Sequence, residues 1–396
     1  MLARRWMSFA ACCAFLALLI GPFKGRIEHA HFREYGTYWA SGNAARHGLN
    51  PFAAYPLTWR FNAFSPDGPE TFDVNLNPPA VLPLFSLLSR FDVYQGGLFC
   101  LTLSIAMFCL SCGVLVWRFK PAAHQVFWMM TGGAILSTLN VLQNYALLFV
   151  LAAAAWMLLD SENDVAAGLF LGALCAFKPN FCLWPVLLAL RGGKRAVVLS
   201  TSATFIVLSA APIPLFGRSV YPEWLSAVQS NPHFIFPQNV SFIANAVRFG
   251  LGQTGYALAA VTIAATCWLA RNRKLTLQQI SGLAICAAIL CSPISWMEYV
   301  LVAVPLLLSR PWTPRQHIAL WLLWIHPYFL DPSNACASNR DFALGGLPYL
   351  AGFILLLTSF ADPISLPGHE RRTHAGADGR DRESEIVESR GSEEAG

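Results

Sequence analysis

Charged residues are scarce in this chain. Only 12% of its 396 residues are Asp, Glu, Lys or Arg, whereas 55% are hydrophobic and the mean hydropathy is +0.48. A soluble domain carries about 25% charged residues. The shortage therefore argues against a soluble protein and favours a polytopic membrane protein. The net charge of +5 gives no reason to expect a nucleic-acid partner.

Motifs that mark several catalytic classes are also missing. The sequence contains no Gly-rich phosphate loop, no readable Ser/His/Asp set and no repeat of fixed period. Its 11 cysteines show neither zinc-site spacing nor a disulfide framework. The one C-x-x-C pair, Cys109 and Cys112, lies inside an apolar run, where burial makes a thiol inert. We therefore expect no metal and no cofactor.

Apolar runs dominate what is present. Arg4-Arg5 precedes a long apolar run that ends near Phe23 without a clean cleavage site, which is typical of a retained signal anchor. Several later runs are shorter than the about 20 residues of a straight span, so we expect tilted or kinked helices. These later runs lie near residues 95–117, 124–140, 143–160, 165–178, 180–190, 196–214, 252–270, 276–292, 296–309, 315–331 and 345–361.

The basic residues predict an orientation. If Arg4-Arg5 is cytoplasmic and the proline-rich segment within 78–91 is a re-entrant half-helix, nearly every short basic loop falls on the cytoplasmic side. Residues 24–91 and 215–251 then form extracytoplasmic loops, and both termini are cytoplasmic. We therefore predict an all-α integral membrane bundle of about 12 transmembrane helices.

Two regions follow from this assignment. Residues 1–361 form the polytopic membrane domain. Residues 362–396 are rich in Glu, Arg, Ser and Gly and are expected to be a disordered cytoplasmic tail.

In this orientation, polar residues that packing does not explain gather on the outer side. A one-sided active site at the membrane boundary accounts for them, whereas a transporter or lipid flippase would place ionisable groups near the bilayer midplane. Gln143-Asn144 can also be a helix start, and Asn239-Val240-Ser241 also matches a glycosylation acceptor, a frequent chance match. The outer-side candidates are Glu34, Asn77, Gln143, Asn144, Lys178, Arg218, Asn239, Trp296 and Glu298.

Lys178 has two interpretations. It lies between two short apolar runs, where a lysine is costly unless it snorkels to the interface or finds an anion. It is either a snorkelling side chain at a helix end or the partner of a lipid phosphate.

Glu34 and Glu298 are the two carboxylates that stand out near the outer boundary. Glu34 precedes Tyr35, Tyr38 and Trp39, so partial desolvation would raise its pKa toward the range of a general base. The alternative is a solvated acid among interfacial aromatic residues. Glu298 begins an apolar run, where it can simply satisfy a helix dipole.

The order of several motifs resembles glycosyltransferase family 87, the polyprenol-phosphate-mannose-dependent mannosyltransferases of the GT-C superfamily. The family pattern Asp-Phe-x-x-Tyr-Tyr-x-Ala-Gly followed by Gly-x-x-Pro-Tyr is similar to Glu34 through Gly42 and Gly48 through Phe52. The resemblance covers about residues 1–361. Its further motifs are Asn77-Pro78-Pro79, Leu142-Gln143-Asn144, Ala167-Gly168 through Lys178-Pro179, Gln238-Asn239-Val240-Ser241 and Ser292-Pro293-Ile294-Ser295-Trp296.

Two positions depart from the family pattern. The family's first-loop Asp is Glu34 here, which keeps the carboxylate on a longer arm. The His that follows the family's Ser-Pro-x-Ser-Trp run is replaced by Glu298 or Tyr299. A catalytically inactive relative is therefore a further alternative.

The resemblance implies transfer of a hexose, most often mannose, from a polyprenyl-phosphate donor to a hydroxyl of a lipid or glycan acceptor, with inversion. Lys178, with Arg218 as a second candidate, would hold the donor phosphate, and Glu34 would be the catalytic base. The expected location is the plasma membrane, with the active site on the extracytoplasmic face. The groove for lipid and sugar would include Tyr38, Trp39, Asn77, Gln143, Asn144, Asn239, Trp296 and Glu298.

Overall fold

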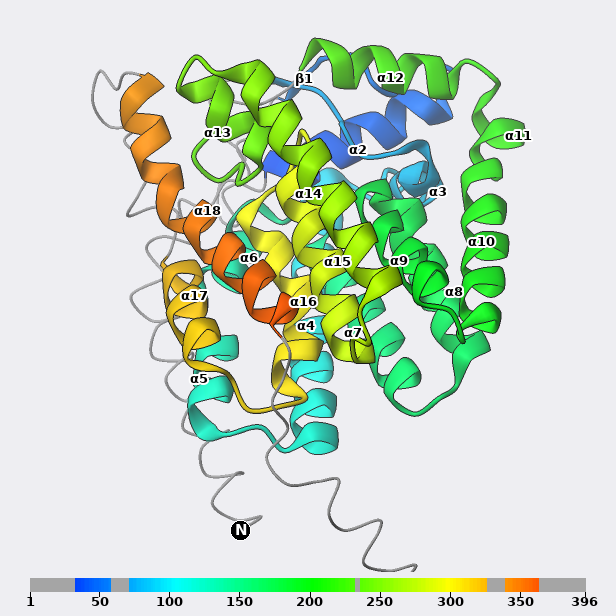
Figure 1. Ribbon diagram of the computed structural model, residues 1–396. Helices are drawn as coiled ribbons and strands as arrows, with labels where there is room; N and C mark the ends of the chain where they lie inside the picture. The colour runs from blue at the N-terminus through cyan, green and yellow to red at the C-terminus, as the bar shows by residue number, and fades with distance from the viewer. Residues whose placement is uncertain (1–32, 58–70, 232–235, 326–338, 363–396) are drawn as a thin grey trace, which may run out of the picture. The chain divides into compact units, whose positions relative to one another are not determined.

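Helices make up most of the described structure. The computed structural model describes residues 33–57, 71–231, 236–325 and 339–362 (Figure 1). The predicted signal anchor and the predicted tail beyond Asp362 lie outside these residues, and the unit described below ends at Ala361.

The described elements follow the chain in this order: α2 (Arg33–Arg46), β1 (Tyr55–Leu57), β2 (Thr71–Asp73), η1 (Pro79–Val81), α3 (Leu82–Leu88), α4 (Val93–Phe119), α5 (Ala123–Thr131), α6 (Gly133–Val141), α7 (Tyr145–Asp160), α8 (Asp164–Phe177), η2 (Pro179–Cys182), α9 (Leu183–Arg191), α10 (Arg195–Ala210), α11 (Pro212–Phe216), α12 (Val220–Ser230), α13 (Phe242–Arg248), α14 (Gly252–Asn272), α15 (Leu277–Cys291), η3 (Met297–Tyr299), α16 (Val300–Leu308), α17 (Pro314–Trp324) and α18 (Asn339–Ala361). The strands β1 and β2 pair antiparallel, with Tyr55 opposite Asp73.

Two helices form the centre of the bundle. Every residue of α16 and nearly all of α15 are buried. This agrees with their sequences, in which apolar residues lie around the helix and not only on one face. A helix that is apolar all round is stable only where neighbours cover it. The neighbours are α7, α9, α14 and α18, which pack directly against this pair.

Helices α8 and α10 approach each other closely through glycine. A Cβ on Gly172 would lie 2.6 Å from the carbonyl oxygen of Thr201 and 2.6 Å from Cβ of Thr204. Gly168 occupies the same face one turn earlier, which makes a small-x-x-x-small contact of the kind that brings membrane helices together. This contact holds α8, and hence Lys178 at its end, against α10.

Three described helices are long and apolar enough to cross a membrane: Val93–Phe119, Arg195–Phe216 and Phe342–Ala361. The other apolar helices are shorter, as the run lengths predicted. Several runs are interrupted within the bundle: the run near 124–140 is split into α5 and α6 at Gly132, and α8 ends before Pro179. The predicted number of about 12 spans and their orientation stay predictions.

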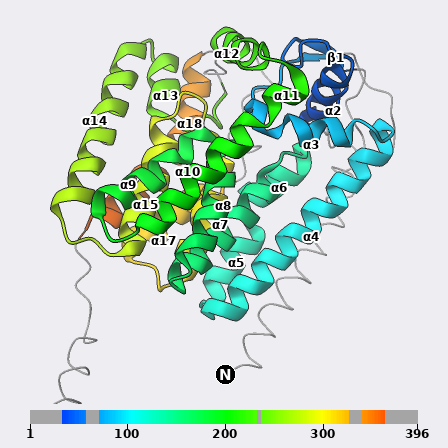
Figure 2. The same cartoon turned by 90° about the vertical axis from the view of Figure 1, so that its right-hand side faces the viewer.

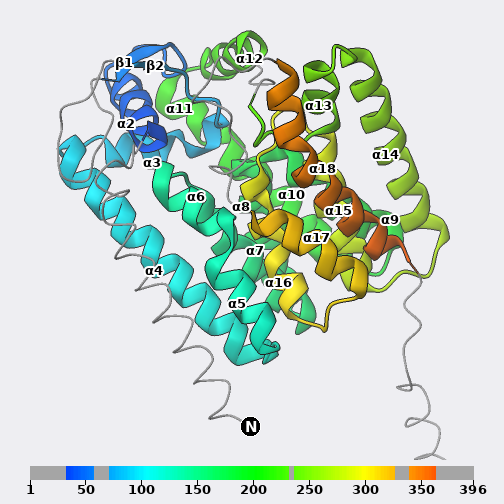
Figure 3. The same cartoon turned by 90° about the vertical axis from the view of Figure 1, so that its left-hand side faces the viewer.

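One end of the bundle is covered by short elements. Helices α2, α3 and α12 and the small sheet lie together at the upper end in all three views (Figures 1, 2 and 3). Glu34, which was predicted in a loop, lies in helix α2. The helix forms because small residues let it pack tightly: Gly42 leaves no room for a Cβ against the backbone of Phe85 in α3.

The close approach of α8 and α10 can be tested with one substitution at two glycines. We expect Gly172→Ala to lower the stability by about 1–3 kcal/mol, because its methyl group meets the backbone of α10. Gly113→Ala in α4, whose Cβ would meet nothing within 4 Å, should be neutral or stabilising by up to about 1 kcal/mol because alanine favours helix. Thermal unfolding in detergent measures both, and equal effects would contradict the contact.

Candidate functional site

A cavity of about 480 Å³ opens among α2, the segment that follows β2, the break between α8 and η2, helix α12 and residues 292–299. These five segments are far apart in the sequence. Both apolar and charged side chains line it, and the charged ones are Arg33, Glu34, Asp73, Lys178 and Glu298.

Glu34 reaches the cavity from the first turn of α2. Thr37 and Tyr38, three and four positions later, line the same wall, as expected for one helix face. Burial raises the pKa of Glu34 to about 6, and the negative charge of Asp73 adds to the rise, whereas Arg33, Gln143 and Lys178 oppose it. A carboxylate in this range can accept a proton near neutral pH.

Lys178 lies in the break between α8 and η2, outside the three candidate spans. Pro179 disfavours helical geometry at the residue before it, and Lys178 is extended, with φ −144° and ψ 90°. Its ammonium nitrogen donates to Asn77 Oδ1 at 2.8 Å and lies 5.9 Å and 5.7 Å from the ring centroids of Tyr145 and Tyr299. Burial lowers the pKa of Lys178 to about 8, against the influence of Glu34.

A chain of buried hydrogen bonds joins α2 to Lys178. Ser41 donates to the carbonyl of Pro51 at 2.7 Å and accepts from Asn75 Nδ2 at 2.8 Å. Asn75 Oδ1 accepts both the backbone N–H and the side-chain amide of Asn77, each at 3.0 Å. Because Ser41, Asn75 and Asn77 are all buried, these bonds fix the position of the acceptor that Lys178 uses.

Glu298 lies on a second wall of the cavity. It is buried in η3 and accepts a hydrogen bond from Ser137 of α6 at 2.5 Å. The preceding loop is held by strand-like bonds to residues 238–240: Val240 N–H donates to Ser295 at 2.8 Å, and Met297 N–H donates to Gln238 at 2.9 Å. Trp296, between these bonds, also lines the cavity.

Most of the residues predicted from the sequence meet in this cavity. Glu34, Tyr38, Asn77, Gln143, Lys178, Trp296 and Glu298 all line it. Tyr38 stacks on Phe85 at 4.4 Å between ring centroids, which holds its ring in the wall.

Four predicted residues do not line the cavity. Trp39 is one position beyond Tyr38, so it faces elsewhere on α2 and donates to the carbonyl of Phe91 at 3.1 Å. Arg218 is exposed in the turn between α11 and α12. Asn144 lies behind the wall and donates to Asn77 at 3.4 Å. Asn239 is fully buried and ties two loops together through the carbonyl of Pro293 at 3.0 Å.

The sequence interpretation missed several cavity residues. Asp73 forms an ion pair with Arg33 at 2.7 Å beside Glu34, and both line the cavity. Asn75, Ser137, Tyr145 and Tyr299 were missed as well. Asp73 and Asn75 alternate with Asn77 at every second position, which would have indicated an extended segment with one polar side.

No group of three or more His, Cys, Asp or Glu residues in the described ranges has the arrangement of a metal site. The cavity instead offers separate carboxylates and one ammonium. The chemistry that such groups supply is proton transfer and charge stabilisation.

Comparison with known proteins identifies the family. The profile of glycosyltransferase family 87 matches residues 75–293, which is more than half of the chain. The chain belongs to glycosyltransferase family 87. Searches of curated proteins and of solved structures return no match. Membership and the apolar helices together indicate a membrane glycosyltransferase, with a sugar donor and an acceptor as substrates.

The family match covers only part of the site. Asn77, Gln143 and Lys178 fall inside the matched range, whereas Glu34 precedes it and Glu298 follows it. The cavity therefore joins residues inside the matched segment to residues on both sides of it.

The buried hydrogen-bond chain can be tested at its middle member. We expect Asn75→Ala to lower the stability by about 1–3 kcal/mol, because the buried side chains of Ser41 and Asn77 each lose one hydrogen bond. Asn43→Ala, on the same helix as Ser41 but at a side chain for which the described structure shows no hydrogen bond, should change the stability little. Thermal unfolding of both variants measures the change. An Asn75→Ala variant as stable as the wild type would contradict the role of these hydrogen bonds.

Proposed function

We propose that this glycosyltransferase transfers a hexose, with mannose as the sugar, from a polyprenyl-phosphate donor to a hydroxyl of a lipid or glycan acceptor. The observation that carries the proposal is Lys178. It lines the cavity, and its ammonium makes one hydrogen bond in the described structure, so two of its three N–H donors remain available for an acceptor. An ammonium presented in this way suits a phosphate.

The reaction is a single displacement with inversion. The acceptor oxygen attacks the anomeric carbon while the bond from that carbon to the phosphate oxygen breaks, and the electron pair of that bond leaves with polyprenyl phosphate. Lys178 stabilises the negative charge on this leaving group. Glu34 takes the proton of the acceptor hydroxyl. Because a phosphate leaves readily, no general acid is needed.

The composition of the cavity supports a lipid-linked sugar donor. Trp224, Trp296 and Tyr38 provide aromatic faces that suit the C–H surfaces of sugars. Glu298 and Gln143 provide acceptors and donors for sugar hydroxyl groups. Glu298 lies close to the position of the His in the family pattern. Because a carboxylate accepts hydrogen bonds from hydroxyl groups and repels a phosphate, we assign Glu298 to the sugar.

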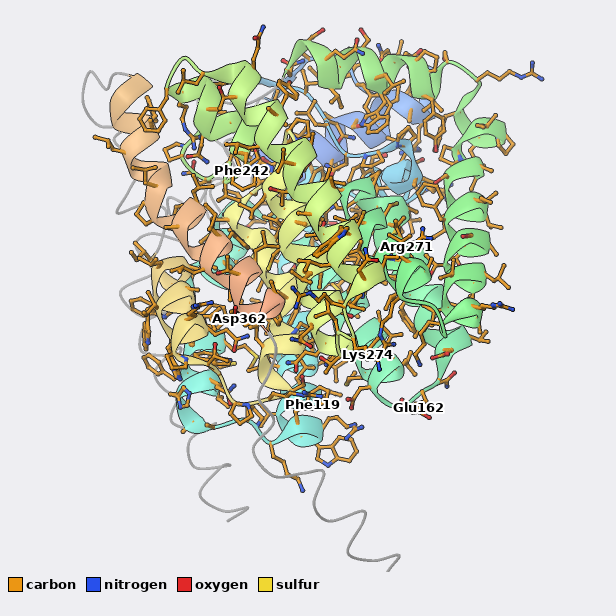
Figure 4. The ribbon with its side chains drawn as sticks, in the orientation of Figure 1. Phe119, Glu162, Phe242, Arg271, Lys274 and Asp362 are labelled. Atoms are coloured by element: carbon orange, nitrogen blue, oxygen red, sulfur yellow. The ribbon has the colours of Figure 1, made fainter. Side chains whose placement is uncertain are left out.

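The distribution of basic residues in the short loops supports an extracytoplasmic site. The turns labelled at Phe119, Glu162 and Lys274 lie toward the lower end of the bundle, whereas α2 and α12 lie at the upper end (Figure 4). Arg118, Lys120 and Lys274 belong to these lower turns. Basic residues mark the cytoplasmic side, so the cavity end would face outward.

The proposal is tested at Glu34. We expect Glu34→Gln to reduce transfer from polyprenyl-phosphate mannose by about 10²- to 10⁴-fold, the usual contribution of a general base, while Glu34→Asp retains part of the activity. Glu223→Gln in α12 removes a carboxylate that does not line the cavity, so it serves as the matched control. Product formation in membranes measures all three. Full activity in the Gln variant would exclude Glu34 as base, and absence of donor-dependent product in the wild type would favour a transporter or an inactive relative.

The pH dependence provides a second test. Glu34 must be unprotonated and Lys178 protonated, so kcat/KM should rise with pH through about 6 and fall through about 8. The profile of the free enzyme is therefore a bell with its maximum near neutral pH. A profile that stays flat between pH 5 and 9 would contradict both assignments.

A further inference from the structure

We propose that Asn77 is a positioning residue that holds the ammonium of Lys178 without neutralising it, and so keeps the full charge available for the donor phosphate. This inference rests on the proposed function of Lys178.

The first observation is the chemistry of the partner. Lys178 Nζ donates to an amide oxygen at 2.8 Å, and no carboxylate oxygen in the described structure lies within 4.0 Å of it. Lys194 differs, because its ammonium forms an ion pair with the carboxylate of Asp164 at 2.7 Å. Of these two lysines, the one at the cavity wall is held by an uncharged group.

The second observation is that the side-chain amide of Asn77 cannot flip by 180° without losing its hydrogen bonds to Asn75 and Lys178. Its nitrogen donates to Asn75 Oδ1 at 3.0 Å, so its oxygen is presented to Lys178. A flip would place an NH₂ group against an ammonium and an oxygen against an oxygen. The orientation is secured further by Ser41, which accepts from the amide of Asn75 at 2.8 Å.

The third observation is the surroundings of the ammonium. Two tyrosine faces lie 5.9 Å and 5.7 Å from it and favour its charged form without removing charge. The amide therefore supplies one directed bond, and the rings complete a neutral cage. The titratable and charged groups around the cavity are Glu34 and Arg33 of α2, Asp73 of β2, Tyr38 of α2, Tyr145 of α7, and Glu298 and Tyr299 of η3.

A neutral acceptor matters because the site must bind an anion and then release one. A carboxylate at position 77 would satisfy the ammonium and compete with the donor phosphate for it. An apolar side chain would leave the ammonium without an anchor. An amide differs from both: it holds the ammonium in place by a hydrogen bond but brings no negative charge to it.

Two substitutions at this one position should move the alkaline limb of kcat/KM in opposite directions. Asn77→Asp places a negative charge beside the ammonium of Lys178, which favours the protonated lysine, and should move the limb to higher pH by about 1–3 pH units. Asn77→Ala removes the acceptor from the ammonium and should move the limb downward. A residue with a merely structural role would lower activity without opposite shifts, so shifts of the same sign or no shifts would overturn the inference.

A binding measurement gives a readout besides activity. The probe is farnesyl phosphate in detergent, with farnesol as the uncharged control. We expect Asn77→Asp to weaken farnesyl phosphate binding by about 10- to 100-fold, the worth of one hydrogen bond to a charged group, and to leave farnesol binding unchanged. Wild-type affinity for farnesyl phosphate in the Asp variant would overturn the inference.

Two further variants separate this inference from the proposed function. Lys178→Met should lose the preference for farnesyl phosphate over farnesol; if it keeps the wild-type preference, the phosphate role of Lys178 fails and not only the role of Asn77. Gln238→Glu adds a carboxylate to the cavity wall at a residue that does not bond to Lys178. The alkaline limb of kcat/KM should move less in Gln238→Glu than in Asn77→Asp. An equal shift would overturn the inference, because a carboxylate anywhere in the cavity would then have the same effect.

Discussion

A half-buried ammonium held by a neutral amide is the interaction around which this structure is arranged. Lys178 can lie within an apolar bundle only because Asn77 and two tyrosine rings compensate part of its lost hydration. The bonds that hold Asn77 pass through Asn75 to Ser41 on α2. The same chain therefore places the helix that carries Glu34.

Interrupted helices supply the rest of the site. The apolar runs end at the cavity, where α6 gives way to the left-handed turn at Leu142, α8 to Pro179 and α15 to Pro293. Each break places a polar side chain at the cavity, namely Gln143, Lys178 and Ser292. Irregular backbone of this kind is tolerated near a membrane only where protein or a polar cavity surrounds it. The close glycine contact between α8 and α10 stabilises one of these breaks.

The two carboxylates that line the cavity differ because their neighbours differ. Glu34 lies beside the Arg33–Asp73 ion pair, which keeps charges of both signs close to it. Glu298 accepts a hydrogen bond from the hydroxyl of Ser137 and is buried in the short helix η3, just before the apolar helix α16. The first environment suits a group that gains and loses a proton, and the second suits a group that accepts hydrogen bonds from a ligand. This difference underlies the separate roles proposed for them.

Much of the architecture follows from composition and periodicity. Low charge and long apolar runs predict a helical membrane bundle, and the motif order predicts the family, which the profile match confirms. Prolines and glycines also predict most breaks, because they act on their own and adjacent residues. Glu34, Asn77, Lys178 and Glu298 stood out because polar residues beside apolar runs are costly.

Only the tertiary structure decided which of these residues meet. It brought Asp73, Asn75 and Ser137 to the cavity, left Arg218 exposed in a turn, and turned Trp39 and Asn239 into structural contacts. The reason is that local sequence determines where a helix ends but not which distant segment covers that end. Neighbours on α2, such as Tyr38 and Trp39, face different partners because packing against α3 sets the rotation of the helix.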